Sequence, residues 1–364
     1  MSNNLTLDLE RIKKEKSDLD VLGDIYFHAV FGEKISAENL ERFKWYGLYA
    51  QDEKQEYFIL RIPLSMGELN LQQIKTLSLI SKEYANNSLI FSSFQKVELK
   101  DIKIFSLPNI FNLLKEVGLD TFFETGHTVR RVLTCPINTI DDSQVFNVSA
   151  LAKKLDETFI GNKKFSNLPN SLQMAISGHE EGCNVQTTPE VSFNATTDNK
   201  DKIIFMIKIL DVNIGYISPV QVINTAKAIA EIYRDFGDRE NFQNSTFEHL
   251  VKKWGMARFF DIVNASTNYK IQRNISTKQS TTPRNPRMGI NKSSIEGESY
   301  IGCKITSSII ENKNLDSLSS LLEKYSASKI KITHKGNIII LDAPSKSAND
   351  FAKELEKINF NPFV

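Results

Sequence analysis

The chain has 364 residues, enough for two domains with cores of their own. Apolar residues make up 41% and charged residues 24%, and the formal net charge is only +1. This balance excludes the basic excess by which proteins bind nucleic acid. The longest apolar run, residues 203–207, is too short to cross a membrane, and the polar N-terminus has no signal-peptide core. Three cysteines form no disulfide framework. We therefore expect a cytoplasmic protein with reduced cysteines and with neither nucleic acid nor a membrane as partner.

Apolar residues at helical spacing and apolar residues at alternate positions, typical of strands, follow each other through the first third of the chain. Residues 1–40 are predicted to form an N-terminal helical arm, followed by a strand over residues 57–62. A second strand is predicted around Gln95, and a further helix over residues 107–117. Between the two strands, apolar residues at helical spacing predict a helix: Leu71, Ile74, Leu77 and Ile80. This order of elements is typical of a small α+β unit.

The same unit comes twice along the chain. When Tyr84 is set against Tyr325, an offset of 241 residues (325 − 84), seven further apolar positions fall into register without a gap. These are Ile74 with Leu315, Leu77 with Leu318, Ile80 with Leu321, Leu89 with Ile330, Phe91 with Ile332, Val97 with Ile338 and Leu99 with Ile340. We interpret the match as an internal duplication, with chance agreement of apolar residues as the alternative.

A larger segment lies between the two copies. It is predicted to contain helices over residues 148–159 and 219–236, and strands over residues 174–177 and 203–210. The stretch that follows is rich in Ser, Thr, Asn and Lys, which predicts a linker or an extended strap. The predicted division is therefore a helical arm (1–40), a first half domain (41–119), a large domain (120–265), a linker (266–297) and a second half domain (298–364).

Several short stretches share their order and spacing with a known family. They are ERFKWYGLY at 41–49, residues 107–119 ending in EVGL, TGHTVRR at 125–131, FSNLP at 165–169, residues 229–237 with Arg239, and WGM at 254–256. In these stretches the chain resembles the nitrite and sulfite reductases that carry sirohaem and a 4Fe–4S cluster. The resemblance implies an α+β fold with a ferredoxin-reductase-like half domain, a larger α/β sirohaem-reductase-type domain and a second half domain.

The resemblance also implies what should follow these domains. In this family a further large domain carries four cysteines, spaced C-x5-C and C-x3-C, for the 4Fe–4S cluster. The sequence ends before that domain would begin, so we expect a degenerate relative that lacks the C-terminal cluster-bearing domain. The partners that fit this expectation are a chain that carries the missing domain or a second copy of this chain.

The family binds its anion with arginine and lysine side chains, which hold the anion and help to protonate it. By resemblance, Arg130 stands where the family has one of these arginines. The neighbouring Arg131 and His127 are further candidates for a residual anion site. The family's other basic residues at this site are replaced here by Phe94, Asn170, Ser171 and Gln173. Most of the positive charge at the anion is therefore predicted to be lost.

Sirohaem has eight carboxylates and needs a dense set of basic partners. By resemblance, Arg239 and Asn337 are the residues expected to keep a contact with the cofactor. Four positions where basic residues are usual hold other residues, namely Phe242, Gln243, Thr246 and Glu248. We therefore expect no bound cofactor, with sirohaem and a 4Fe–4S cluster present only if a partner chain completes the site.

Two of the cysteines and one histidine have a ligand-like arrangement. His179 and Cys183 stand four residues apart, and Cys135 lies upstream before a proline. A metal or iron–sulfur site is one interpretation, since His can replace Cys as a cluster ligand. A small buried cysteine and a loop histidine are the alternative, which we favour.

These observations favour a nitrite/sulfite reductase-like protein that has lost independent catalysis and has a structural, regulatory or relic role. Whether it is an enzyme stays open; if active, it is an oxidoreductase of this type. One alternative is a subunit of a split sirohaem/4Fe–4S oxidoreductase, which reduces nitrite or sulfite with a partner chain. The other is a tetrapyrrole- or small-anion-binding module without redox activity.

Overall fold

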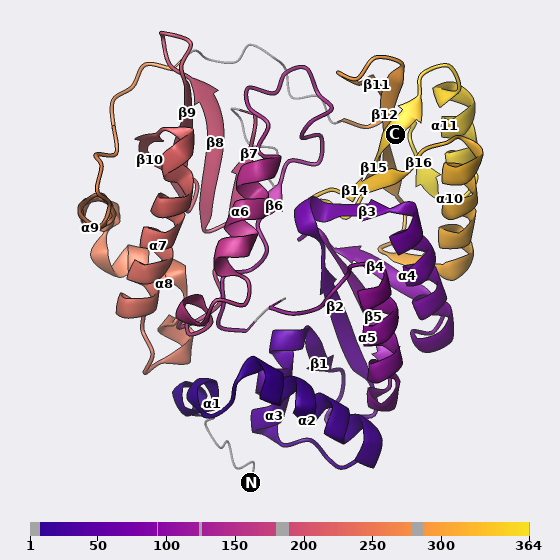
Figure 1. The fold of residues 1–364 in the computed structure, drawn as a ribbon, viewed down its shortest axis with the longest axis horizontal. Coiled ribbons are helices and arrows are strands. Elements are labelled where there is room, and N and C mark those ends of the chain that lie inside the picture. The colour runs from indigo at the N-terminus through magenta and orange to yellow at the C-terminus, as the bar shows by residue number, and fades with distance from the viewer. Residues whose placement is uncertain (1–7, 93, 124–125, 180–188, 278–286, 364) are drawn as a thin grey trace.

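The computed structural model describes residues 8–92, 94–123, 126–179, 189–277 and 287–363. Figure 1 shows the strands β6 to β10 with their helices on one side, the two half-domain sheets on the other, and the N-terminal helices beneath. The predicted α+β fold, with a half domain on either side of a large domain in sequence, is confirmed. Within the described ranges, none of the helices is long and apolar enough to cross a membrane.

Three short helices form the N-terminal arm. They are α1 (Leu9–Glu15), α2 (Asp18–Phe31) and α3 (Ala37–Phe43). Each begins where a polar side chain accepts a hydrogen bond from the backbone N–H three residues on, which satisfies an otherwise unpaired amide. The capping residues are Asp8, Ser17 and Ser36.

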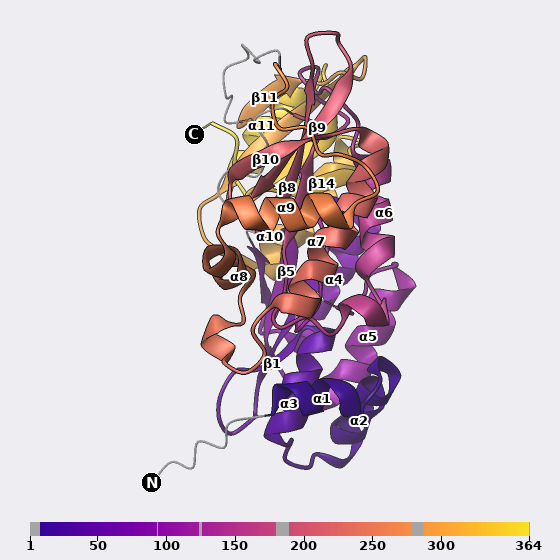
Figure 2. The ribbon, with the colours of Figure 1, turned by 90° about the vertical axis from the view of Figure 1, so that its left-hand side faces the viewer.

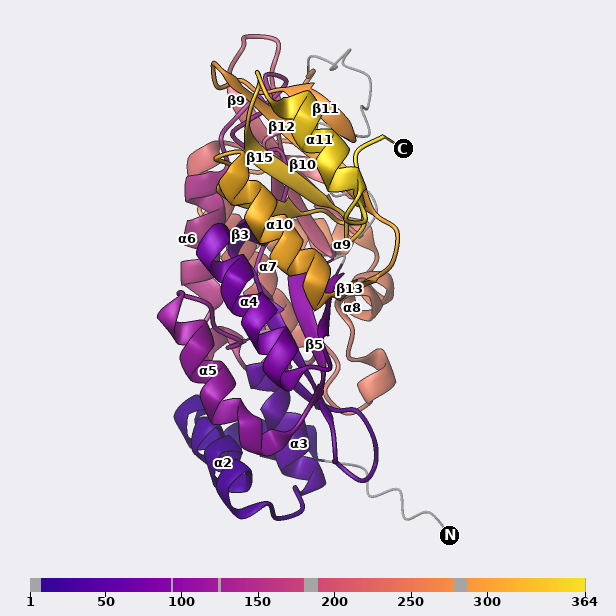
Figure 3. The same cartoon turned by 90° about the vertical axis from the view of Figure 1, so that its right-hand side faces the viewer.

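The first half-domain sheet has the strand order β1-β2-β5-β4-β13. Its antiparallel neighbours from the first copy are β1 (Leu48–Ala50), β2 (Phe58–Pro63), β5 (Lys96–Ile102) and β4 (Ser88–Ser92). The helices α4 (Leu71–Tyr84) and α5 (Leu107–Glu116) lie on the outer face (Figure 3). The sequence pattern predicted one strand around Gln95, whereas the chain turns there and forms the β4–β5 hairpin.

The second half-domain sheet repeats this arrangement with the order β11-β12-β15-β14-β3. Its strands from the second copy are β11 (Gly289–Lys292), β12 (Glu298–Ile305), β15 (Ile338–Pro344) and β14 (Lys329–Ile332), and β16 (Phe360–Asn361) pairs with β12. Its helices are α10 (Asn312–Lys324) and α11 (Ala348–Glu356). Strand β11 lies within the stretch predicted as a linker, because its pairing with β12 uses the main chain and needs no apolar pattern.

The two half domains exchange a strand. Strand β3 (Glu68–Asn70) of the first copy pairs with β14, and β13 (Ile309–Glu311) of the second copy pairs with β4. Helix α4 begins at Leu71 and α10 at Asn312, an offset of 241 residues (312 − 71). The predicted duplication is therefore confirmed, and the buried apolar side chains of both copies belong to one continuous core.

The large domain has a sheet of its own with the order β10-β9-β8-β7-β6. Strands β6 (Leu133–Thr134), β7 (Met174–Ser177) and β8 (Val191–Thr197) are parallel neighbours, and β9 (Ile203–Ile209) and β10 (Val212–Ile217) continue the sheet antiparallel. Helices α6 (Ser149–Phe159) and α7 (Val222–Phe236) pack on the sheet, while α8 (Phe247–Trp254) and α9 (Met256–Ser266) lie on the side away from the half domains (Figure 2). These elements share a second core.

Candidate functional site

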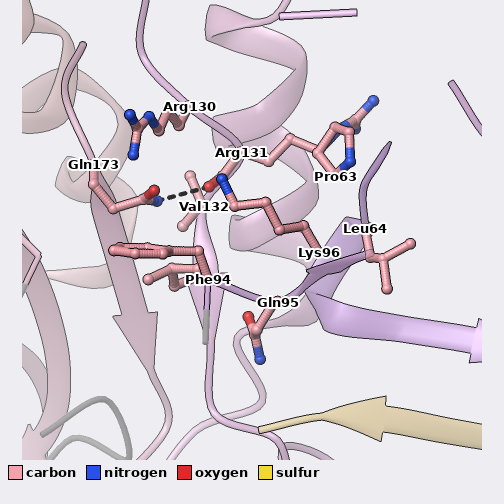
Figure 4. A pocket seen from close by; sticks show the side chains of 10 residues that line it. Pro63, Leu64, Phe94, Gln95, Lys96, Arg130, Arg131, Val132 and Gln173 are labelled. Carbon is pink, nitrogen blue, oxygen red and sulfur yellow. Dashed lines mark hydrogen bonds between the residues drawn. The ribbon is translucent and has the colours of Figure 1, made fainter. Parts of the chain in front are cut away.

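A pocket lies where the first half domain meets the large domain (Figure 4). Its walls come from the end of β2, the start of β5, the segment that leads into β6 and the residue before β7. The space inside measures about 10 Å³, roughly room for one water molecule. We call it the interdomain pocket. The residues that concern its chemistry are Phe94, Lys96, Arg130, Arg131 and Gln173.

The Phe94 ring lies under two cations in this group. The Cζ atom of Arg130 is 6.0 Å from the ring centroid, and the Nζ atom of Lys96 is 5.3 Å from it. Phe94 lies in the turn between β4 and β5, and Lys96 is the first residue of β5. Aromatic faces attract cations, so the ring interacts with both side chains.

Gln173 lines the pocket but directs its amide group at the main chain. Its Nε2 atom donates hydrogen bonds to the carbonyl oxygens of Arg131 at 2.8 Å (dashed in Figure 4) and Met174 at 3.1 Å. Its backbone N–H donates to the Glu190 carboxylate at 2.9 Å. Burial raises the pKa of Glu190, although the Arg130 charge acts in the opposite direction. Gln173 therefore supports the pocket wall and places a carboxyl group near Arg130.

Arg131 is paired on the side away from the pocket. Its Nη2 atom donates to both carboxylate oxygens of Asp120, at 3.0 and 2.9 Å, and its Nη1 atom is 3.9 Å from Asp156. Asp156 also accepts a hydrogen bond from the Val132 amide at 2.8 Å. Burial raises the pKa of Asp156 to about 6.

Buried polar atoms without hydrogen-bond partners gather next to the pocket. Among the described residues, the run 127–131 contributes four of them: His127 Nε2, Thr128 Oγ1, Arg130 Nε and Arg131 Nε. Buried polar groups are normally hydrogen-bonded, and exceptions commonly mark a place where a ligand or water binds. The segment that leads into β6 is therefore the best candidate in this part of the chain for contact with a ligand.

His127 does not join Arg130 at the pocket. The Nδ1 atom of its buried ring lies 3.0 Å from the carbonyl oxygen of Pro169, and the Nε2 atom lies 3.7 Å from the Glu41 carboxylate. A histidine that faces a carboxylate and a carbonyl is poorly placed to attract an anion. The predicted grouping of His127 with Arg130 and Arg131 is therefore corrected by the structure.

The two residues predicted as residual cofactor contacts are bound within the fold. Arg239 donates to Glu10 at 2.7 Å and to the carbonyl oxygens of Asn167 and Arg234, so it attaches α1 to the end of α7. Asn337 accepts a hydrogen bond from the Ile305 amide at 3.0 Å and belongs to the turn between β14 and β15. Neither lines the interdomain pocket.

The remaining predicted positions also have local roles. Asn170 donates to Ser245 and accepts from the amide of Ser171. Phe242 is 61% exposed, and Gln243 follows it in a short turn. Thr246 caps α8, and Glu248 pairs with Lys252 at 2.5 Å within that helix. Of the positions predicted to have lost basic charge, the structure brings Phe94 and Gln173 together with Arg130.

The candidate metal ligands do not form a site among the described residues. His179 Nε2 is 3.5 Å from a carboxylate oxygen of Asp141, and Cys183 lies outside the described residues. Cys135 is buried and disulfide-bonded, which corrects the expectation of reduced cysteines, whereas Cys303 is a buried free thiol. In the described ranges, no group of three or more His, Cys, Asp or Glu side chains is placed to hold a metal ion.

Sequence reasoning missed Lys96, Glu190 and Asp156. Lys96 stands only two residues from Phe94, but strand alternation could not place it at the site, because Phe94 lies in the turn and Gln95 has a left-handed backbone. The two carboxyl groups come from distant parts of the chain, and only the fold brings them near the arginines.

Comparison with known protein families identifies the ancestry of this fold. The model described as the nitrite and sulphite reductase 4Fe-4S domain matches residues 125–271. The model described as the nitrite/sulfite reductase ferredoxin-like half domain matches residues 49–117 and 294–358. This chain belongs to the nitrite/sulfite reductase family. The resemblance seen in the sequence is therefore confirmed.

Individual members of the family match along nearly the whole chain. A ferredoxin–nitrite reductase of Synechococcus elongatus is 23% identical over 97% of this chain and 72% of its own length. A ferredoxin sulfite reductase of Mycobacterium tuberculosis is 23% identical over 96% of this chain and 68% of its own length. The solved structure of the Mycobacterium tuberculosis NirA protein superposes with a TM-score of 0.88 at 22% identity, covering 98% of this chain and 70% of that one. That superposition confirms the fold.

The expectation that this nitrite/sulfite reductase relative binds no cofactor is wrong. It is overturned by the match to the 4Fe-4S domain model, since the family to which this chain and its relatives belong carries sirohaem and 4Fe-4S cofactors. The described residues nevertheless fit a sirohaem poorly at the two positions predicted for it. The guanidinium of Arg239 already binds Glu10 and main-chain carbonyls, and the side-chain oxygen of Asn337 already accepts a backbone hydrogen bond.

Proposed function

We propose that this nitrite/sulfite reductase-like protein does not reduce nitrite or sulfite by itself and keeps its pocket for binding a small anion. The observation that carries the proposal is the Phe94 ring, which lies under both Arg130 and Lys96 in a pocket with space for about one water molecule. Reduction of an oxyanion needs cationic donors that hold and protonate it as charge develops. A phenyl ring supplies neither a charge nor a proton.

The partners of the surrounding polar groups support the same proposal. Gln173 uses its amide hydrogens on main-chain carbonyls, and Arg131 directs its guanidinium at Asp120. These hydrogen bonds lie within the large domain and hold both side chains on protein groups, as expected for a chain with a structural or regulatory role. The cations that remain directed at the pocket favour residual binding of an anion over turnover.

The test is an activity assay on the intact chain, both as purified and after reconstitution with sirohaem and an iron–sulfur cluster. Reduced methyl viologen serves as the electron donor, with nitrite or sulfite as acceptor, and a catalytically active reductase of the same family is the positive control. We expect no turnover above the rate without protein. Turnover by this chain alone would contradict the proposal.

The same assay separates the proposed function from the split-enzyme alternative. A second chain that carries a cysteine-rich cluster domain is added to the reaction at increasing concentration. We expect the rate to stay at the background level. A rate that rises and saturates with the second chain would instead favour a subunit of a two-chain oxidoreductase.

A further inference from the structure

We infer that helix α1 is a releasable strap, which holds the large domain against the rest of the N-terminal arm through charged contacts and can undock while the remaining molecule stays folded. The inference goes beyond the proposed function and does not depend on it, since none of the residues that line the interdomain pocket belongs to α1. It gives the arm a conformational role that is controlled by ionic strength.

Two side chains of α1 contact the large domain. Glu10 accepts a hydrogen bond from the Nη1 atom of Arg239 at 2.7 Å, and the Nζ atom of Lys13 donates to the carbonyl oxygen of Leu168 at 3.0 Å. Arg239 also donates to the carbonyl oxygen of Asn167, so both contacts lead to the same loop. Glu10 and Lys13 pair with each other one helical turn apart. Helix α1 is therefore attached to this loop by one connected set of charges and carbonyl oxygens.

Apolar burial contributes little to the docking of α1. The buried apolar side chain of this helix, Ile12, belongs to neither the half-domain core nor the large-domain core in the described part of the chain. Towards the arm, Arg42 of α3 donates to the carbonyl oxygen of Ile12 at 3.3 Å and to Glu15 at 2.7 Å. The side chains of Glu10 and Arg239 are 27% and 26% exposed, so dissolved salt can screen their attraction. The docking of α1 therefore depends mainly on charge.

The chain can release α1 without disturbing the helix that follows it. A helix of seven residues is too short to be stable in water by itself, so α1 would unfold when it undocks. Lys16 has an extended backbone between the two helices, and Ser17 caps α2 through a capping box with Asp20. Helix α2 also buries Val21 and Ile25 in the half-domain core. Helix α1 is therefore a separate unit of low local stability.

Hydrogen exchange of the intact chain, read by mass spectrometry of peptides that cover residues 9–15, tests the inference. Between about 0.05 M and about 0.5 M sodium chloride we expect these amides to exchange several-fold faster, while those of α2 change little. Glu10→Gln and Arg239→Gln should each speed exchange in α1 on the order of tenfold, because each removes a charge-assisted hydrogen bond. Lys14→Gln is the matched control, since Lys14 is exposed in the same helix and forms no ion pair among the described residues.

The double variant shows whether Glu10 and Arg239 act as one pair. Glu10→Gln combined with Arg239→Gln should exchange no faster in α1 than Arg239→Gln alone. Additive effects, or an equal effect of Lys14→Gln, would overturn the role of this pair. Exchange of α1 in the native chain that does not respond to salt, or that occurs only together with α2, would overturn the strap itself. None of these results concerns turnover, so the proposed function would stand in each case.

Discussion

Asp156 carries a buried carboxyl group whose ionisation opposes folding. It lies against the Val132 amide and 3.9 Å from Arg131, yet burial raises its pKa from 3.8 to about 6. The folded chain therefore holds this proton more firmly than the unfolded chain does. Between about pH 3.8 and about pH 6 the folded state binds more protons, so stability falls as the pH rises through this window.

Asp156→Asn should remove this penalty, because the amide oxygen can still accept the Val132 hydrogen bond. At pH 8 we expect the variant to be more stable than the native chain, by up to about 3 kcal/mol at 1.36 kcal/mol per pKa unit. Urea unfolding at pH 4 and pH 8 measures the difference. Asp120→Asn, whose carboxylate is 55% exposed, is the control and should change stability little. An identical pH dependence in Asp156→Asn and the native chain would refute the assignment.

Single residues also show how far the site could be predicted from sequence. Arg130, Phe94 and Gln173 were assigned to one site through the family resemblance, and the structure does bring them together. His127 was placed with them because it is close in sequence, but the chain turns its ring towards Glu41. Lys96 was missed because the resemblance singles out only family positions, and because the turn at Gln95 breaks the alternation by which a strand pattern would place it.

At the scale of elements, the β4–β5 turn depends on one strained residue. Gln95 has a left-handed backbone with φ of 55°, which is unfavourable for a residue other than glycine. Its buried side chain donates to the carbonyl oxygens of Thr134 and Ile332 and accepts from the Thr134 amide. The equivalent turn in the second copy holds Gly336, where an added Cβ would lie 2.6 Å from the Phe91 carbonyl oxygen. A residue with a side chain therefore does not fit at position 336 without a shift of the backbone.

Gln95→Ala should therefore destabilise the chain by about 2–4 kcal/mol, because it leaves buried main-chain groups of Thr134 and Ile332 unpaired while the strain remains. Asn87→Ala is the matched control, since Asn87 has the same φ of 55° but is exposed. Asn87→Ala should lower the free energy of unfolding by less than about 1 kcal/mol, because it changes only the fit of the residue to the left-handed backbone. Urea unfolding gives both values. Equal losses in the two variants would show that the Gln95 side chain contributes nothing.

Elements with a clear apolar period were predicted well, and short paired strands were not. The helices α4, α5, α6 and α7 lie where helical spacing placed them, because their buried faces recur every three to four residues. The strands β3 and β13 have three residues each and pair through main-chain groups alone. Their exchange between the two copies could not be predicted from side-chain patterns.

At the scale of the whole molecule, the strand exchange joins residues far apart in sequence. Asn312 at the start of α10 donates to the carbonyl and hydroxyl oxygens of Ser78 in α4, both at 2.7 Å. Lys75 pairs with Glu323 across the same two helices at 2.5 Å. Because the two copies share one core, they should unfold as a single cooperative unit rather than as two domains.

Cutting the chain between residues 271 and 289 should therefore not separate its two parts. One fragment keeps β3 and the other keeps β13, so each completes a sheet of its partner. We expect both fragments to elute together in native size-exclusion chromatography and to separate only in urea. Ile310→Lys should lower the urea concentration needed, since Ile310 is 3% exposed in β13, whereas Ile309→Lys, at a position that is 51% exposed in the same strand, should not. Fragments that separate without denaturant would show that the exchanged strands do not hold the molecule together.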